Sequence, residues 1–349
     1  MPTEAKPVVI PEELEPLFPA RVVSGVQPSP AGIHLGNYFG AVVTHMRLQH
    51  EYPGDSFYLI ADYHALTMER DADAIRAGTT CLALDYMAAG LDPDKSTLYR
   101  QSDVPQICEL MWLLACITRK TRLDRAHAYQ TATARGELPS AGLFLYPALM
   151  AADILALRGT DVPVGHDQQQ HLEIAREIAR GFNGLWGSVF PVPYLRATTT
   201  PLVLGIDGQK MSKSYHNTLP VFWDDSEAFE ARVSHIVTES AALGEPTDPE
   251  RSTVFSLYQL VAAPDAISEM RGGLADGSLG FAEAKRLLLH ALVRHFAPLH
   301  ERRRELASDG EYIADVLREG ARRVREEAEA TLDIVRDRVG LSQYRRRLL

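Results

Sequence analysis

The N-terminal third of the chain alternates between short apolar runs and segments with helical periodicity, and this alternation constrains the fold most. Arg21–Val23 begins a β-branched run that breaks into a Gly/Pro loop, and "AGIHLGNYFGAVVTHMRLQH" continues with helical spacing. "SFYLIADYHALT" is a second run of strand length, a helical segment follows it, and "STLYRQSDV" supplies a third strand candidate. The alternation predicts an α/β fold: a Rossmann-type parallel sheet flanked by helices, whose ligands bind beyond the carboxyl ends of the strands.

The remaining chain is mainly helical, which predicts a division into parts. "VPQICELMWLLACITRKTRLDRA" to "DQQQHLEIAREIARGF" indicates a helical insertion at about 105–185, with "DVPVGHDQ" as a loop between helices. The chain of 349 residues exceeds the roughly 250 to 300 at which single cores stop growing. We expect a loose leader over 1–20, partly helical near Glu12 to Leu17, a Rossmann-type domain over 21–224 and an all-helical domain over 225–349.

Composition excludes several classes of protein. No apolar run approaches the roughly 20 residues that span a bilayer, and the N-terminus lacks the features of a signal peptide, so we expect a cytoplasmic protein without membrane contact. Cys81, Cys108 and Cys116 form no C-x-x-C pair, which favours reduced, buried thiols and no metal site. The net charge of −10 argues against non-specific coating of nucleic acid but leaves room for a local basic surface.

Two short segments have the composition of phosphate-binding sites. "PSPAGIHLGN", Pro28 to Asn37, opens the first helix after the first strand, where backbone N–H groups and the helix dipole favour an anion. The alternative interpretation of this glycine-rich turn, taken alone, is a tight connection between the strand and the helix without a ligand. "KMSKS", Lys210 to Ser214, places two ammonium groups among small residues. A solvated loop is the alternative here, but it explains neither Gly208 nor the two serines.

The pairing of "HLGN" early with "KMSKS" late resembles the two signatures of class I aminoacyl-tRNA synthetases. "SGVQPSPAGIHLGNYFGA", "YPALMAADILAL" and "DVPVGHDQQQHLEIAREIARGFN" narrow the resemblance to the tryptophanyl-tRNA synthetases of bacteria, from about Arg21 to the C-terminal helices. The tyrosyl enzymes share the architecture but usually differ at "VPVGHDQQQH".

This resemblance implies a function, cofactors and partners. A member of the family activates L-tryptophan with ATP and Mg²⁺ to tryptophanyl-adenylate and transfers the amino acid to tRNA(Trp), with the helical domain reading the anticodon. It implies a homodimer with the insertion at the interface. Three alternatives stay open: a paralogue that serves as a resistance isoform or adenylates an amino acid for another pathway, a tyrosyl-type enzyme, and a non-catalytic tRNA-binding or regulatory protein. The intact signatures argue against the last.

The resemblance also assigns site residues. ATP is expected at Gln27, Pro28, Ser29, His34, Gly36, Asn37, Gly165, His166, Asp167, Lys210, Met211, Ser212, Lys213 and Ser214. Gln27, His34, Lys210 and Lys213 are the expected catalytic residues. Tryptophan is expected at Gly25, His64, Tyr146, Met150, Asp153, Ile154, Val162, Val164, Gln168 and His171. No protein ligand to a metal is expected.

Asp153 has a clear chemical task in this assignment, because a buried carboxylate can accept the indole N–H. Its alternatives, a helix cap or a surface acid, are weakened by the apolar flanks of "LMAADILAL". For Met150 the alternative is core filling, and the roles of His64 and His171 rest on the resemblance alone.

The sequence departs from the family pattern at several positions. "PSPAG" is about one residue longer than the usual "PSG". Gln130 stands where a lysine near the pyrophosphate is expected, and Arg125 or Arg135 is a candidate substitute. His166 stands where an acid is common, and Val23 stands where an aromatic side chain often packs on the indole.

Overall fold

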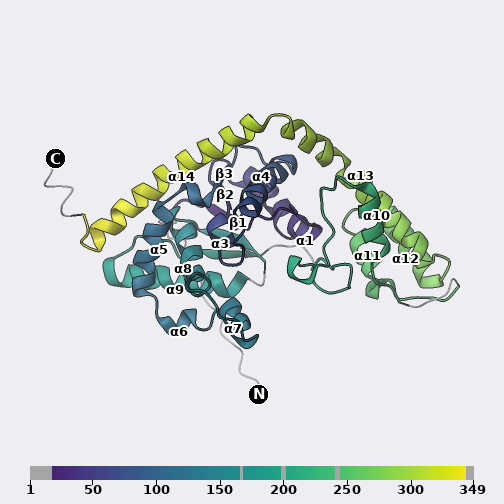
Figure 1. Ribbon diagram of the computed structural model, residues 1–349, viewed down its shortest axis with the longest axis horizontal. Helices are drawn as coiled ribbons and strands as arrows, with labels where there is room; N and C mark the ends of the chain where they lie inside the picture. Colours follow the sequence, from purple (N-terminus) through teal and green to yellow (C-terminus); the bar gives the residue numbers. More distant parts are fainter. Residues whose placement is uncertain (1–17, 166–167, 198–201, 240–243, 343–349) are drawn as a thin grey trace, which may run out of the picture.

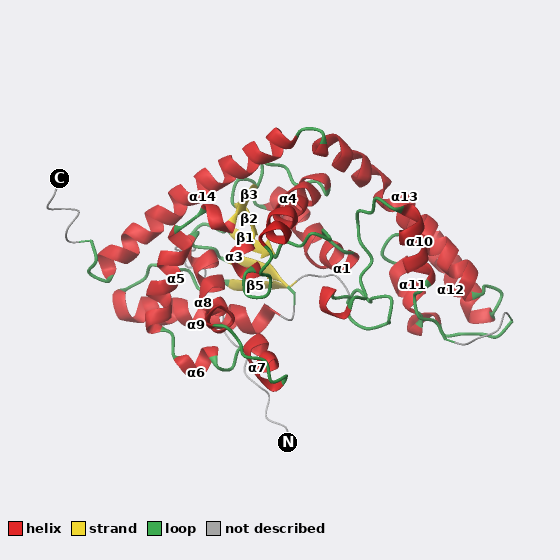
Figure 2. Cartoon of the chain, viewed as in Figure 1, coloured by secondary structure: helices red, strands yellow, loops and turns green. Residues whose placement is uncertain are grey.

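The computed structural model describes residues 18–165, 168–197, 202–239 and 244–342 around a five-stranded parallel sheet (Figures 1 and 2). The strand order is β3-β2-β1-β4-β5, and each neighbouring pair is parallel. The strands are β1 Val22–Val26, β2 Ser56–Ile60, β3 Thr97–Arg100, β4 Asp161–Val164 and β5 Tyr194–Ala197. The chain runs outward from β1 to β3 and then crosses to β4, so the strand order reverses between β1 and β4, where ligands bind in such sheets. The predicted α/β fold and its first three strands are confirmed.

The prediction of a loop at "DVPVGHDQ" was wrong, because this segment contains β4. Pro163 in β4 has no N–H, and a proline within a run normally argues against a central strand. β4 pairs with β1 only at Val22↔Asp161, whereas it pairs with β5 along its whole length. The hydroxyl of Ser24 donates to the Pro163 carbonyl over 2.9 Å and so replaces part of the missing ladder. The expected helical insertion therefore contains a central strand of the sheet, and β5 is a further strand that the sequence analysis missed.

Alternate residues of the strands supply two cores, one on each face of the sheet. Tyr58 and Ile60 of β2 pack in a core with the first helices and the C-terminal helices, while Phe57 and Leu59 face a core with the helices that follow β3. The helices before β5 are α1 Leu35–Asn37, α2 Val43–Glu51, α3 Asp62–Ala65, α4 Ala72–Ala88, α5 Gln106–Ile117, α6 Lys120–Leu123, α7 His127–Ala134, α8 Ala141–Ala156 and α9 Gln169–Trp186. A π-helical turn, Tyr38–Val42, joins α1 to α2.

The C-terminal helices form a second group and then return to the sheet (Figure 1). They are α10 Ser226–Ser234, α11 Thr253–Tyr258, α12 Pro264–Asp276, α13 Phe281–Ala307 and α14 Gly310–Arg338. We call α10 to α13 the C-terminal body. α14 runs back from it and packs on β3 so closely that a Cβ at Gly320 would lie 2.0 Å from the Leu98 carbonyl oxygen.

The expected domain boundaries stay a prediction, and the expected helix near Glu12 to Leu17 lies outside the described residues. Within the described ranges, no helix is both long and apolar enough to cross a membrane.

Candidate active site

The loop after β1 forms a tight turn at the carboxyl edge of the sheet. The N–H of Gly32 donates to the Ser29 carbonyl over 2.9 Å, and Gly32 has a φ of +67° that favours glycine. A Cβ at Gly78 in α4 would lie 2.8 Å from the Ser29 amide nitrogen. α4 therefore holds this turn, which follows the predicted ATP residues Gln27 and Pro28, against movement toward the helix.

His34 and Asn37 cap the helix that begins the first signature. The N–H of Asn37 donates to His34 Nδ1, and the N–H of His34 donates to Asn37 Oδ1, each over 3.3 Å. Burial, assisted by the positive charge of Lys213, lowers the pKa of His34 to about 4. The imidazole is therefore neutral at pH 7. Because Nδ1 accepts in this cap, the ring hydrogen is on Nε2, which can donate to a phosphate oxygen.

The two signatures are in contact, although 175 positions separate the residues that join them. The N–H of Gly36 lies 3.3 Å from the sulfur of Met211, which is buried. A Cβ at Gly36 would lie 2.9 Å from Cε1 and Nδ1 of His34 and 3.3 Å from Cβ of Met211. Only glycine leaves room for both neighbours at this position. Met211, predicted on ATP, thus packs on the first signature.

Asn217 fixes the second signature, and the sequence analysis missed it. Its Oδ1 accepts from the N–H of Ser212 over 2.8 Å, and its Nδ2 donates to the Lys210 carbonyl over 3.0 Å and to Asp207 over 2.8 Å. Asn217 is buried and follows directly in "SYHN". A buried amide that bonds the backbone of a loop is required for that loop's shape. The signal available in sequence was an asparagine just beyond the lysines.

Lys213 lies beside the first signature. Its side chain reaches solvent, but the surrounding chain desolvates the ammonium enough to lower its pKa, an effect that Cys81 and Asp85 of α4 oppose. Its charge in turn acts on His34. A cation held here, already partly stripped of water, is suited to a negatively charged ligand.

A second group of polar side chains surrounds Asp153, which lies in α8 and is 2% exposed. Nε2 of His64 is 3.0 Å from Oδ2 of Asp153, and Nε2 of Gln101 donates to Oδ1 over 2.8 Å and to Oδ2 over 2.9 Å. Burial raises the pKa of Asp153, and the hydrogen bonds from His64 and Gln101 oppose that rise. Asp153 is thus a buried acceptor and neither a helix cap nor a surface acid.

The sequence analysis did not identify Gln101 as a site residue, although it directly follows β3. A polar residue at the carboxyl end of an expected strand was the available signal.

Tyr146, His171 and Gln168 extend this group. The hydroxyl of Tyr146 bonds the His171 imidazole, and Nδ1 of His171 lies 2.9 Å from Oε1 of Gln168. The ring of Tyr146 also meets the His64 ring edge-on, at 6.1 Å between centroids. The structure therefore brings together five of the residues predicted to bind tryptophan, from α3, α8 and the start of α9.

The remaining predicted residues are apolar or glycine. Ile154 and Val162 are buried in the core on the same face as Val23, and Met150 and Val164 are partly buried beside that core. A Cβ at Gly25 would lie 2.5 Å from Cγ of Leu59, so β1 and β2 leave no room there. Gly165 is partly buried, and its carbonyl accepts from the Gln168 N–H. His166, Asp167 and the side chain of Ser214 lie outside the described residues.

Gln130, which departs from the family pattern, and the three cysteines lie outside both groups of polar side chains. Gln130 lies in α7 and donates to the Asp124 carbonyl, so its amide is used within the helical segment. The prediction of buried thiols was wrong for Cys116, which is exposed on α5, while Cys81 and Cys108 are partly buried. Within the described parts of the chain, no three metal-ligating side chains are grouped to hold an ion.

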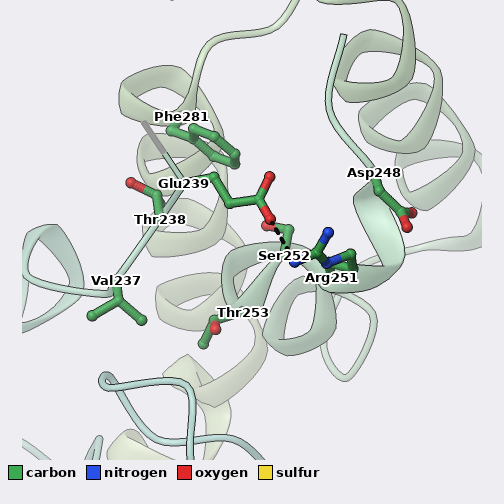
Figure 3. A pocket seen from close by; sticks show the side chains of 8 residues that line it. All are labelled: Val237, Thr238, Glu239, Asp248, Arg251, Ser252, Thr253 and Phe281. Atoms are coloured by element: carbon green, nitrogen blue, oxygen red, sulfur yellow. Dashed lines mark ion pairs between the residues drawn. The ribbon is translucent and has the colours of Figure 1, made fainter. Parts of the chain in front are cut away.

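A separate pocket of ≈ 220 Å³ lies in the C-terminal body (Figure 3). Glu239 and Arg251 form an ion pair of 3.5 Å at its wall, with Val237 and Thr253 beside them. The N–H of Val237 donates to the Ile206 carbonyl over 2.8 Å. This pocket therefore borders the turn before the second signature and is distinct from the group around Asp153.

The parallel sheet, with two signature segments docked beside its switch point, defines a class I aminoacyl-tRNA synthetase. The family model for class I tRNA synthetases (W and Y) matches residues 17–296, and the chain belongs to this family.

Individual relatives are named as tryptophan enzymes. The chain is 43% identical over 322 residues to the tryptophan–tRNA ligase of Rhodopirellula baltica, with 92% of this chain and 99% of that protein covered. It is 42% identical over 324 residues to that of Fusobacterium nucleatum, with 92% and 98% covered. The crystal structure of tryptophanyl-tRNA synthetase from Campylobacter jejuni complexed with ADP and tryptophan has a TM-score of 0.84 and 36% identity, covering 92% of this chain and all of that one.

Proposed function

We propose that this chain is a tryptophan–tRNA ligase, which activates L-tryptophan with ATP and transfers it to tRNA(Trp). The observation that carries the proposal is the contact between Gly36 and Met211, because it brings the two signatures to one edge of the parallel sheet. The names of the relatives support tryptophan as the amino acid.

ATP binds between the two signatures in this proposal. Adenosine lies on the turn at Gln27, Pro28 and Ser29 and on the helix start at Gly36 and Asn37, and Nε2–H of His34 donates to a phosphate oxygen. Gly165, His166 and Asp167 take the ribose side. Lys210 and Lys213 neutralise the charge that builds on the leaving pyrophosphate, with Ser212 and Ser214 beside them.

The activation step needs no protein nucleophile. A carboxylate oxygen of tryptophan attacks the α-phosphorus in line, the new O–P bond forms, and the bond to pyrophosphate breaks with the electron pair leaving on pyrophosphate. Positioning of the two reactants can supply about 7 to 11 kcal/mol of the barrier. Mg²⁺ accompanies the ATP phosphates and adds positive charge there. The chain would supply no side-chain ligand to this ion.

Tryptophan binds beside the Asp153 group. The carboxylate of Asp153 accepts the indole N–H, and Gln168 and His171 face the amino end. The pocket around the ring is lined by His64, Tyr146, Met150, Ile154, Val162, Val164 and Gly25. A site built around such an acceptor rejects phenylalanine, because that side chain leaves the buried carboxylate unpaired. Discrimination of this kind can reach roughly 10⁴ to 10⁵.

For the transfer step and the assembly, the proposal is supported by the resemblance to the family. The 2′-hydroxyl of the terminal ribose accepts the tryptophanyl group, and the helical domain after residue 224 reads the anticodon through unpaired bases. The enzyme is a cytoplasmic homodimer with α5 to α9 at the interface.

Two assays test this function. ATP–pyrophosphate exchange is run with tryptophan, tyrosine and phenylalanine, followed by charging of tRNA(Trp). Exchange and charging with tryptophan alone are expected. Exchange without charging would instead indicate a paralogue that adenylates an amino acid for another purpose, exchange with tyrosine would indicate a tyrosyl-type enzyme, and absence of exchange would refute an activating enzyme.

A further inference from the structure

Two described side chains, Gln101 and His64, bond the Asp153 carboxylate. Gln101 donates to both oxygens, at 2.8 Å and 2.9 Å, and His64 approaches Oδ2 at 3.0 Å. A carboxylate offers about four acceptor positions, two on each oxygen. One N–H of Gln101 is thus shared between the two oxygens while His64 bonds Oδ2 alone, so among the described residues Oδ1 has more acceptor capacity left for a further donor.

Gln101 makes these bonds at an energetic cost to its own amide. It is fully buried, and its NH₂ must face Asp153 because an ionised carboxylate only accepts. This orientation leaves Oε1 of Gln101 without a partner among the described residues. Buried amide oxygens are nearly always bonded, and an exception calls for an explanation in function.

We propose that Gln101 is a positioning residue for the amino acid: it fixes the plane of the Asp153 carboxylate so that Oδ1 faces the indole N–H. This inference rests on the proposed function. Gln101 needs no contact with tryptophan for this role. The residues proposed to surround the indole, in contrast, act by contacting it.

The charges around Asp153 explain why the carboxylate needs such support. Burial and the negative charge of Asp62 raise the pKa of Asp153, and only His64 and Gln101 oppose the rise. Among the described residues, Tyr99 of β3 and Cys108 of α5 also lie within reach of the charge of Asp153, and neither brings a positive charge. Loss of Gln101 therefore raises the pKa of Asp153 further. A protonated Asp153 is a poorer acceptor.

The test compares tryptophan with β-(3-benzothienyl)alanine, in which sulfur replaces the indole N–H. The dissociation constants of both are measured by titration calorimetry on the full chain, with Gln101→Met as the variant. The constant for tryptophan should rise between about tenfold and a hundredfold, the range for a hydrogen bond to a charged group. The constant for the analogue should change less than about twofold, KM for ATP should stay constant, and tryptophan binding should weaken further as pH falls.

Gln49→Met is the matched control. Gln49 is also a buried glutamine, with 1% exposure, and its amide bonds the Gly90 carbonyl and the Asp92 N–H away from Asp153. This variant should lose stability and keep the wild-type ratio of the two dissociation constants.

The outcomes distinguish the role of Gln101 from the proposed function. An equal loss for both ligands, or no loss for tryptophan, overturns the positioning role. If Gln101→Met does not fold, Gln101→Asn, which withdraws the amide by one methylene, must show the same selective loss. A wild-type chain that neither binds nor activates tryptophan refutes the proposed function itself, whereas a wild type that does both leaves only the role of Gln101 at stake.

Discussion

Gly36→Ala separates the stability of the fold from the geometry of the proposed ATP site. The new Cβ would lie 2.9 Å from the His34 ring and 3.3 Å from Cβ of Met211, both closer than ordinary contact, so the two signatures must move apart. Weakening the His34 cap costs about 1 kcal/mol. Replacing a helical glycine by alanine returns roughly 0.8 to 1.0 kcal/mol. These terms nearly cancel, so the free energy of unfolding should change by less than about 1 kcal/mol.

Activity should respond far more strongly to the same change. A misplacement of about 1 Å at a reacting centre can cost about a hundredfold in rate, so kcat/KM for ATP in pyrophosphate exchange should fall between roughly tenfold and a hundredfold. Gly40→Ala is the control, because a Cβ there meets nothing within 4 Å. It should keep full activity. Wild-type kcat/KM for ATP in Gly36→Ala, with unchanged stability, would refute the conclusion that Gly36 holds the two signatures in register.

Three further predictions concern buried charged or titratable groups. Asp153→Asn should raise KM for tryptophan in pyrophosphate exchange by about ten- to a hundredfold, because the new NH₂ faces donors; an unchanged KM would exclude Asp153 as the indole acceptor. The pKa of His34 is lowered to about 4, so the unfolded chain takes up a proton first as pH falls. Stability is thus fully present above pH 6.5 and declines toward pH 4 by about 3 kcal/mol from this group. Urea unfolding of His34→Gln at pH 7 and pH 4.5 should show a smaller decline than wild type, and an identical decline would contradict the assignment. Arg303→Met leaves the fully buried Asp85 without its ion pair of 2.7 Å and should lower the free energy of unfolding by about 3 kcal/mol, the low end for a buried pair since Arg303 is 23% exposed; restoration by a second change, Asp85→Asn, would support the pairing, and a loss under about 1 kcal/mol would exclude it.

The sequence predicted the parts of the fold in which local pattern and tertiary environment agree. β2 is buried on both sides and reads as a continuous apolar run, as central parallel strands do. β4 carries Asp161 and Pro163, so its composition argues against a strand. Its pairing with β5 and the Ser24 hydroxyl supply what the local sequence lacks. Long-range partners of this kind are invisible to a periodicity argument.

Some side chains of the candidate site were missed for the same reason, because their partners are distant in the sequence. The signatures could be found because glycine and lysine at fixed positions have few structural substitutes. Gln101 and Asn217 were missed because a glutamine after a strand and an asparagine after a loop are ordinary surface residues until their burial is known. Each is defined by what it bonds across the fold, Asp153 in one case and the backbone of Lys210 and Ser212 in the other.

The contacts around Ile33 join the C-terminal body to the first signature. Asp85 accepts from the Ile33 N–H over 2.9 Å and from Arg303 of α13 over 2.7 Å. His300 of α13 lies 2.9 Å from the Val221 carbonyl, and the N–H of Val221 donates to the Ile33 carbonyl over 3.0 Å. Both polar groups of the Ile33 backbone are thus bonded, through one intermediate residue each, to the same helix. Because His34 follows Ile33 directly, a displacement of α13 that keeps these bonds must also displace the imidazole proposed to meet the phosphates. The helical domain proposed to read the anticodon is therefore connected to the site proposed for activation through Asp85 and Val221.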